Sequence, residues 1–389
     1  MPRLSGTIAL PDGSTVRGRL AFDATISAVE RAPSRSGDYV VPGFIDLQVN
    51  FPQELASQRV SAVELVWLAG ELAREGVTGF LATAITQPLE RLERIHGIVA
   101  EVMDRDREAG DADAGRADAG LLGLHLEGPF IARERLGAHP PFNQKPRGRA
   151  FKRILAMDRV RLVTLAPELP GALAAVRRLA RRGIAVSLGH SSATLEQACA
   201  AVAAGGRMFT HLFNAMAPIH HRAPGLALAG LLAAPAYAAV IPDGVHLHPA
   251  ILRLVYRCRG ARAMLLTTDR VGLLAPAGIR GVPRSAASSW RPRRVLSARL
   301  GKAAALRPTA PRKVALAGST VTMLDGFKMM VEKVGATVAE AALMAATNPA
   351  AILNLADRGA IRPGARADFV LLSHDLKLKA VFVGGREVG

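Results

Sequence analysis

Five acidic or histidine side chains stand at or just after the ends of short apolar runs in this 389-residue chain. They are Glu127, His190, His211, His246 and Asp269. Short apolar runs are typical of buried strands, and parallel strands bring their carboxyl ends together. Two imidazoles and one carboxylate with an open position form a ligand set for a catalytic zinc or iron ion. Such an ion polarises a carbonyl and acidifies water, and Asp269 is a spare carboxylate for proton transfer.

Each of these residues also has a purely structural interpretation. A single histidine after an apolar run is more often a hydrogen-bonded core residue than a metal ligand. Glu127 could pair with an arginine, and Asp269 could cap a helix N-terminus. Five such groups at separate run ends favour the metal site.

The elements that must position these residues are eight apolar runs, most of them separated by helical patterns. The runs cover residues 44–50, 79–86, 121–128, 160–168, 184–190, 207–214, 238–244 and 263–269. Buried strands alternating with helices predict an α/β fold, a (β/α)8 TIM-type barrel whose C-terminal mouth carries the chemistry. An open doubly wound sheet is the alternative.

The two ends of the chain show a different pattern. Residues 1–42 and 356–389 alternate apolar and polar residues between Gly/Pro turns, which predicts strands. We expect them to form one small β-sandwich domain, with the hydrolase barrel spanning 43–355. The acidic, Ala/Gly-rich residues 103–120 are expected to form a solvated loop.

The composition is strongly basic, with 50 Lys and Arg against 32 Asp and Glu and a net charge of +18. Ten of the basic residues lie in an atypical, acid-free segment, 280–313, and removing them leaves +8. The charge is therefore weak evidence for nucleic acid, and aromatic residues make up only 4% of the chain, too few to favour a stacking groove. No apolar run is long enough to span a membrane. The two cysteines, Cys199 and Cys258, indicate no disulfide framework, so we expect a cytoplasmic protein. From the charge distribution and the low aromatic content, we expect no specific nucleic-acid binding.

Eight motifs then occur in order: VPGFIDLQVN (41–50), GLHLEGPFI (123–131), SLGHSSAT (187–194), THLFNAM (210–216), HRAPGL (221–226), PDGVHLHP (242–249), TTD (267–269) and LAGSTVTM (316–323). Together they resemble the N-acetylglucosamine-6-phosphate deacetylases of the amidohydrolase superfamily. The resemblance implies metal-dependent hydrolysis of the acetamide of N-acetylglucosamine 6-phosphate, giving glucosamine 6-phosphate and acetate in amino-sugar catabolism.

Carried over by position, the resemblance assigns the central residues their roles. Glu127, His190 and His211 are the implied metal ligands, holding one divalent ion per subunit, with zinc or iron expected. Asp269 is the implied general base and then acid. His246 is the implied residue beside the acetamide carbonyl.

The resemblance also implies how the sugar phosphate is held. The backbone amides of Asn214 and Ala215 and the side chain of Arg222 are the implied phosphate donors, and His139 lies near the sugar phosphate. In this family the arginine reaches the partner subunit's site, so a homodimer is implied.

The strand-one position, which in many amidohydrolases holds a second metal through His-x-His, reads Gln48-Val49-Asn50 here. Amides are weak ligands for transition metals, so one main ion is expected. His125 lies two residues before Glu127, on the same side of the strand, and is expected to be a packing or supporting residue.

Three departures from the family pattern leave alternatives open. Bulky Phe51 follows Asn50, and Arg270 follows Asp269, where a cation would weaken the carboxyl as an acid. The segment 280–313 reads either as a frame-altered stretch or as a genuine basic loop. The alternatives to the implied function are therefore another amidohydrolase (a deacetylase of a different N-acetylated sugar phosphate, or a deaminase), an inactive barrel homologue, and a polyanion-binding protein.

Overall fold

The computed structural model describes residues 2–33, 36–51, 61–109, 117–271, 295–296, 303–306 and 315–389. Within the atypical segment 280–313, this includes only two short strands, β13 (Val295–Leu296) and β14 (Ala303–Leu306). They pair antiparallel with each other, and β14 also pairs with β15 (Ala315–Ser319). Both interpretations of the rest of that segment lie outside the described residues.

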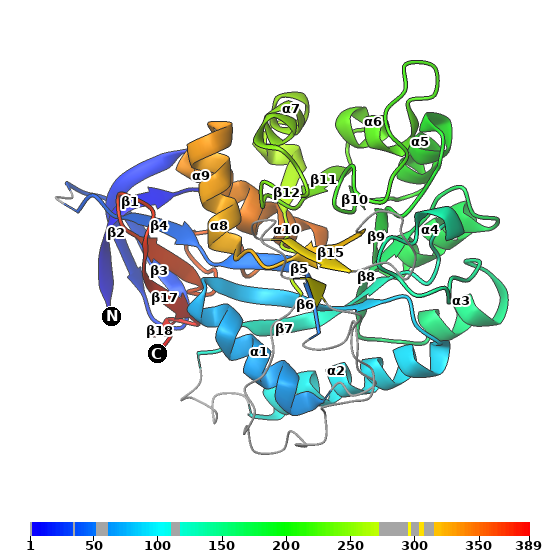
Figure 1. Cartoon of the computed structure of the whole chain (residues 1–389). Coiled ribbons are helices and arrows are strands. Elements are labelled where there is room, and N and C mark those ends of the chain that lie inside the picture. The colour runs from blue at the N-terminus through cyan, green and yellow to red at the C-terminus, as the bar shows by residue number, and fades with distance from the viewer. Residues whose placement is uncertain are drawn as a thin grey trace.

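A parallel barrel forms the body of the molecule (Figure 1). Among the described residues its eight strands are β5 (Phe44–Asn50), β6 (Val77–Ile85), β7 (Gly120–Glu127), β8 (Val160–Leu165), β9 (Ala185–Leu188), β10 (Met208–Phe209), β11 (Tyr237–Val240) and β12 (Met264–Leu266). Each falls on one of the eight apolar runs, so the predicted α/β barrel is confirmed. A parallel bridge between Val49 and Arg270 joins the first strand to the end of the last.

Two apolar layers explain why the strands read as nearly continuous hydrophobic runs. Side chains such as Ile45, Leu81, Leu162 and Leu265 form an inner cluster, closed by Ile352 of α10 (Asn348–Ile352). Alternate residues point outward into the larger cluster beneath the surrounding helices.

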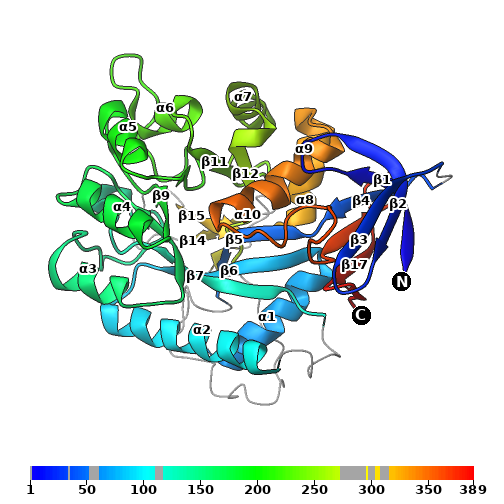
Figure 2. The same ribbon diagram turned by 180° about the vertical axis from the view of Figure 1, so that it is seen from behind.

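The helices cover the outside of the barrel on all sides (Figures 1 and 2). They are α1 (Ala62–Arg74), α2 (Leu89–Ala109), α3 (Gly148–Leu155), α4 (Ala172–Arg181), α5 (Leu195–Ala203), α6 (Gly225–Leu232) and α7 (Pro249–Arg259). The expected loop over 103–120 was partly wrong, because α2 continues to Ala109. The acidic and basic side chains of this part of α2 lie on its exposed face. Charge composition alone does not distinguish such a face from a solvated loop.

Two helical stretches lead from the barrel to the second sheet. The first joins α8 (Met323–Lys328) to a π-helix, Met329–Val334. The second joins α9 (Val338–Ala342), a π-helix at Leu343–Thr347, and α10. No helix among the described residues is long and apolar enough to cross a membrane.

Both chain ends contribute to a separate mixed sheet, in which β1 and β4 pair parallel and the other neighbours pair antiparallel. Its strands in the described residues are β1 (Arg3–Ala9), β2 (Thr15–Phe22), β3 (Ile26–Arg31), β4 (Tyr39–Pro42), β16 (Phe369–Leu372), β17 (Leu378–Val383) and β18 (Arg386–Glu387). The rings of Phe22 and Phe369 lie 4.8 Å apart, although two strands separate β2 from β16. The sheet therefore curls over its own core, as the predicted β-domain requires. The boundaries after residues 42 and 355 stay predictions.

Candidate active site

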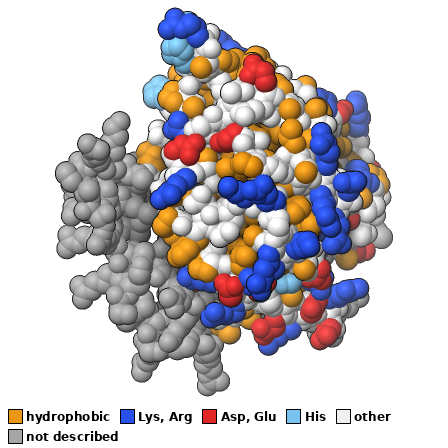
Figure 3. All heavy atoms as spheres, turned by 90° about the vertical axis from the view of Figure 1, so that its right-hand side faces the viewer, with side chains coloured by type: hydrophobic (Ala, Val, Ile, Leu, Met, Phe, Trp, Pro, Cys, Tyr) orange, Lys and Arg blue, Asp and Glu red, His pale blue; other side chains and the backbone are white. Residues whose placement is uncertain are grey.

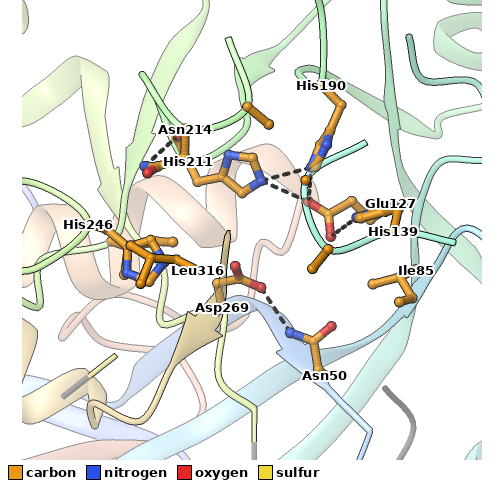
Figure 4. A pocket seen from close by; sticks show the side chains of 15 residues that line it. Asn50, Ile85, Glu127, His139, His190, His211, Asn214, His246, Asp269 and Leu316 are labelled. Atoms are coloured by element: carbon orange, nitrogen blue, oxygen red, sulfur yellow. Dashed lines mark hydrogen bonds and ion pairs between the residues drawn. The ribbon is translucent and has the colours of Figure 1, made fainter. Parts of the chain in front are cut away.

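A cavity of about 280 Å³ opens at the C-terminal mouth of the barrel. Figure 4 shows the side chains of Glu127, His190 and His211 pointing toward one another, with Asp269 and Asn50 facing them. The cavity is lined by Asn50, Ile85, Glu127, Gly137, Ala138, His139, His190, His211, Asn214, Ala215, Ile241, His246, Asp269, Leu316 and Gly318. Most residues expected from the sequence therefore meet in one place.

Three candidate ligand atoms converge at the centre of this cavity. The Nε2 atoms of His190 and His211 lie 3.2 Å apart. They lie 3.2 and 2.9 Å from Oε1 of Glu127. All three side chains are buried, and their ligand atoms fall within 4.8 Å of one another. Burying a carboxylate among imidazole nitrogens fits a divalent cation.

The neighbours of the two rings support the same conclusion. Nδ1 of His190 lies 2.8 Å from the carbonyl oxygen of Arg135, which can only accept. Nδ1 therefore carries the hydrogen, and Nε2 offers its lone pair to the centre. The tautomer of His211 has no such anchor, because its Nδ1 has no hydrogen-bond partner among the described residues.

The backbone is strained where these residues leave their strands. His190, His211 and Asp269 have φ angles of 50°, 28° and 46°, in the left-handed region that residues other than glycine rarely adopt. Gly189 permits the tight turn before His190, because a Cβ there would lie 2.9 Å from Cβ of Thr210. Strain of this kind is concentrated at functional sites.

The strand-one amides connect the two carboxylates rather than joining the imidazoles. Gln48 Nε2 donates to Oε1 of Glu127 at 2.9 Å and to Oδ1 of Asp269 at 3.0 Å. Asn50 Nδ2 donates to the same oxygen of Asp269 at 2.9 Å. The second oxygen, Oδ2, of Asp269 is left to face the cavity.

Burial and neighbours push the two carboxyl groups in opposite directions. Burial, together with the negative charge of Glu127, raises the pKa of Asp269 to about 6. Burial opposes ionisation of Glu127 as well, but its contacts with the imidazoles of His139, His190 and His211 hold its pKa well below the ordinary value. Glu127 is therefore a permanent anion suited to ligation, and Asp269 is suited to exchange a proton near neutral pH.

His246 is fixed by a residue that the sequence reasoning missed. Its Nδ1 lies 2.6 Å from Oδ2 of Asp243, and both side chains are buried. The other oxygen of Asp243 accepts the backbone N–H groups of Val245 and His246 at 2.8 and 2.7 Å. This leaves Nε2 of His246 for a ligand in the cavity. Asp243 stands in the quoted PDGVHLHP motif, three residues before the histidine, which was the available signal.

His139 is placed against the central carboxylate. Its Nε2 lies 3.2 Å from Oε2 of Glu127, and its Nδ1 lies 2.9 Å from the hydroxyl of Thr86. Burial and the neighbouring His190 lower the pKa of His139 to about 4. His125 lies deeper in the barrel, hydrogen-bonded to Thr164 at 2.8 Å, in the supporting place expected for it.

The expected phosphate-binding residues are only partly together. Asn214 and Ala215 line the cavity. The backbone N–H of Asn214, however, already donates to the carbonyl oxygen of His211 at 2.9 Å. Arg222 is exposed on the loop between β10 and α6, which projects from the body (Figure 1). Within one chain Arg222 contacts His221 at 2.9 Å and does not line the cavity.

The two local departures from the family pattern do not obstruct the cavity. Phe51 is buried in the outer apolar cluster. Arg270 pairs with the carboxylate of Glu75, just after α1, so its guanidinium is directed to another partner than Asp269. The ion pair with Glu75 matches the alternative in which Arg270 points away from the site.

Some apolar and glycine residues on the cavity wall were not predicted from the sequence. They include Ile85, Ile241, Leu316 and Gly318. Leu316 and Gly318 belong to the LAGSTVTM motif, so their order in the chain was a signal. Nothing in the local pattern marks Ile85 or Ile241 as different from other strand residues.

The amidohydrolase family model matches residues 39–388. The N-acetylglucosamine-6-phosphate deacetylase of Danio rerio is 36% identical over 369 residues, which cover 90% of this chain and 84% of that protein. The N-acetylgalactosamine-6-phosphate deacetylase of Escherichia coli O157:H7 is 33% identical over 374 residues, which cover 94% of this chain and 92% of that protein.

A solved structure gives the same result. An N-acetyl-D-glucosamine-6-phosphate deacetylase mutant from Mycobacterium smegmatis, in complex with N-acetyl-D-glucosamine-6-phosphate, is 30% identical with a TM-score of 0.78. The match covers 99% of this chain and 98% of that chain. The similarity therefore includes both the barrel and the β-domain.

Proposed function

Because the chain belongs to the amidohydrolase family, and within it to the N-acetylglucosamine-6-phosphate deacetylases, we propose that it hydrolyses the acetamide of N-acetylglucosamine 6-phosphate. The products are glucosamine 6-phosphate and acetate. The observation that carries this proposal is the buried Glu127, His190 and His211 cluster in the same cavity as Asp269.

Glu127, His190 and His211 would hold one divalent ion per subunit. Their donor set suits zinc or iron, and availability decides between the two. When bound, the ion supplies Lewis acidity, which polarises the acetyl carbonyl and lowers the pKa of water.

Asp269 and His246 carry the remaining chemistry. Ionised Asp269 accepts a proton from the attacking water through Oδ2, while Gln48 and Asn50 hold its other oxygen. It then returns this proton to the sugar nitrogen as the C–N bond breaks. Nε2 of His246, when protonated, donates to the carbonyl oxygen as negative charge develops there.

The sugar phosphate would be held by the turn at Asn214 and Ala215, by His139, and by Arg222 of the partner subunit. The exposed position of Arg222, away from its own cavity, supports a homodimer in which this loop crosses to the other protomer. A cytoplasmic location suits a phosphorylated substrate.

N-Acetylgalactosamine 6-phosphate is the second candidate substrate, because the Escherichia coli relative carries that name. The two sugars differ only in the configuration at C4. Acetate release from both, measured at limiting substrate, separates them. We expect kcat/KM to favour the glucosamine compound at least about 10-fold, and the reverse preference would overturn the substrate assignment.

A further inference from the structure

Glu168 follows strand β8, outside the cavity, and its carboxylate contacts the turn that carries His190. One oxygen accepts the hydroxyl of Ser191 and the other accepts the backbone N–H of Ser192, both at 2.7 Å. These are the two residues directly after His190. We propose that Glu168 is a positioning residue that fixes this turn, and through it both the metal affinity of the site and the substrate-binding turn.

The first link runs from Glu168 to the imidazole. Ser192 Oγ also accepts Nε of Arg135 at 2.7 Å, and the carbonyl of Arg135 lies 2.8 Å from Nδ1 of His190. The backbone of His190 is held in turn by the N–H of Ala132, which donates to its carbonyl at 2.9 Å. Glu168 is therefore connected, through Ser192 and Arg135, to Nδ1 of His190, the candidate metal ligand.

The second link runs from Glu168 to the neighbouring strand. Ser191 is fully buried, and its backbone N–H donates to the carbonyl of Ala215 at 3.1 Å. Ala215 belongs to the turn after His211 and lines the cavity. One carboxylate thus sets the spacing between the turns that carry His190 and His211.

The physical need for such an anchor lies in the backbone. His190 has a φ of 50°, a conformation that its own sequence does not favour. External hydrogen bonds must hold it there, because a ring rotated by even a small angle no longer aims Nε2 at the centre. Partners that orient ligands in this way typically change metal affinity by about 10- to 100-fold when they are removed.

This inference rests on the proposed function, since it assumes that the cluster binds a divalent ion. The test uses the full chain, stripped of metal by chelation, and compares wild type with Glu168→Gln. Glu93→Gln is the matched control, because Glu93 also uses both oxygens, accepting Arg153 at 2.6 Å, on the outer helix α2. Zinc affinity is measured by competition with a chromophoric chelator, and unfolding of the metal-free proteins is followed by heating.

We expect Glu168→Gln to weaken zinc binding by about 10- to 100-fold, with Glu93→Gln unchanged. At saturating zinc, KM for N-acetylglucosamine 6-phosphate should rise more than kcat falls, because the turn at Ala215 is loosened while Asp269 is untouched. If Glu168→Gln does not fold, Ser191→Ala removes one of the two hydrogen bonds without changing charge and should weaken zinc binding several-fold.

Zinc affinity of the folded variant equal to that of wild type would overturn the inference and leave the proposed function standing. A wild-type chain that binds no zinc would instead remove the proposed function on which the inference depends. A third outcome is that the two variants lose the same amount of zinc affinity and show the same fall in the melting temperature of the metal-free protein. That result would show a purely structural effect and would also overturn the inference.

Discussion

At the scale of single residues, the site depends on two buried carboxyl groups with different tasks. Glu127 contacts three imidazoles, which keep it ionised. The hydrogen bonds to Asp269 within the described residues come from the amides of Gln48 and Asn50, and Asp269 faces the negative charge of Glu127. Pairs of carboxyl groups whose environments separate their pKa values in this way are typical of acid–base catalysis. Asp269 is therefore the residue whose removal should cost most in turnover.

Replacing Asp269 with asparagine tests this role. The amide keeps the size of the side chain and cannot accept or return the proton, so kcat should fall by about 10²- to 10⁴-fold. Metal content, measured by atomic absorption on the same preparation, should stay at the wild-type level because Glu127, His190 and His211 are intact. Turnover within a few-fold of wild type would contradict the assignment.

The pH dependence of the reaction gives a second test at this scale. Only ionised Asp269 accepts a proton, so kcat/KM should fall as the pH drops through its pKa. Burial and Glu127 raise that pKa from 3.8 to about 6, and the charge of a bound cation acts in the opposite direction. The midpoint of the acid limb should therefore lie between these two values.

The control is metal content at each pH, which separates loss of the ion from protonation of Asp269. A rate that rises toward acid, or a midpoint above about pH 7, would be incompatible with an ionised Asp269 as the base.

At the scale of elements, the seam between β5 and β12 decides whether the site is assembled. Among the described residues, the backbone pairing there is the bridge between Val49 and Arg270. Asp46 reinforces it, because its buried carboxylate accepts the hydroxyls of Thr267 and Thr268 at 2.8 and 2.5 Å. The same side chain thus fixes β5 before Gln48 and β12 before Asp269.

Substituting Asp46 with alanine should open this seam. Thr267, Thr268 and the backbone N–H of Gln48 would lose their acceptor inside the barrel, at a cost of about 1–3 kcal/mol in the free energy of unfolding. The matched control is Asp38→Ala, which breaks an exposed ion pair with Lys379 and should cost at most about 1 kcal/mol.

Chemical denaturation of both variants measures the difference. Equal stability of Asp46→Ala and Asp38→Ala would contradict the role given to the seam.

The elements that could be predicted from the sequence are those with a repeating local signal. Eight apolar runs and the polar groups at their ends sufficed for the barrel and for the meeting of Glu127, His190 and His211. The direction of a single side chain has no such signal: Arg270 follows Asp269 in sequence but pairs with Glu75. Contacts between distant segments, such as that of Glu168 with Ser191, likewise depend on tertiary packing.

At the scale of the whole molecule, the net charge of +18 divides between the segment 280–313, which carries ten basic and no acidic residues, and the rest of the chain, which carries +8. Lys and Arg outnumber acidic side chains on the face shown in Figure 3. Exposed arginines also gather in and just after α4, at Arg177, Arg178, Arg181 and Arg182. Phosphate recognition needs only a few local donors, so the overall charge says little about the substrate.

The proposed homodimer can be tested by combining two different inactive subunits in one dimer. If Arg222 serves the partner's cavity, Asp269→Asn and Arg222→Ala subunits, each of low activity alone, should complement when refolded together. A mixed dimer then contains one complete site, so an equal mixture should recover up to about a quarter of the wild-type sites. Recovery no greater than the mean of the separate variants would place Arg222 outside the partner's cavity.

The most direct test of the proposed deacetylase activity is acetate release from N-acetylglucosamine 6-phosphate by the purified, metal-stripped chain. We expect no turnover without metal, and equimolar release of acetate and glucosamine 6-phosphate once zinc or ferrous iron is restored at one ion per subunit. Absence of acetate with every divalent metal, from a chain that binds one ion, would contradict the proposed deacetylase activity and leave only the fold.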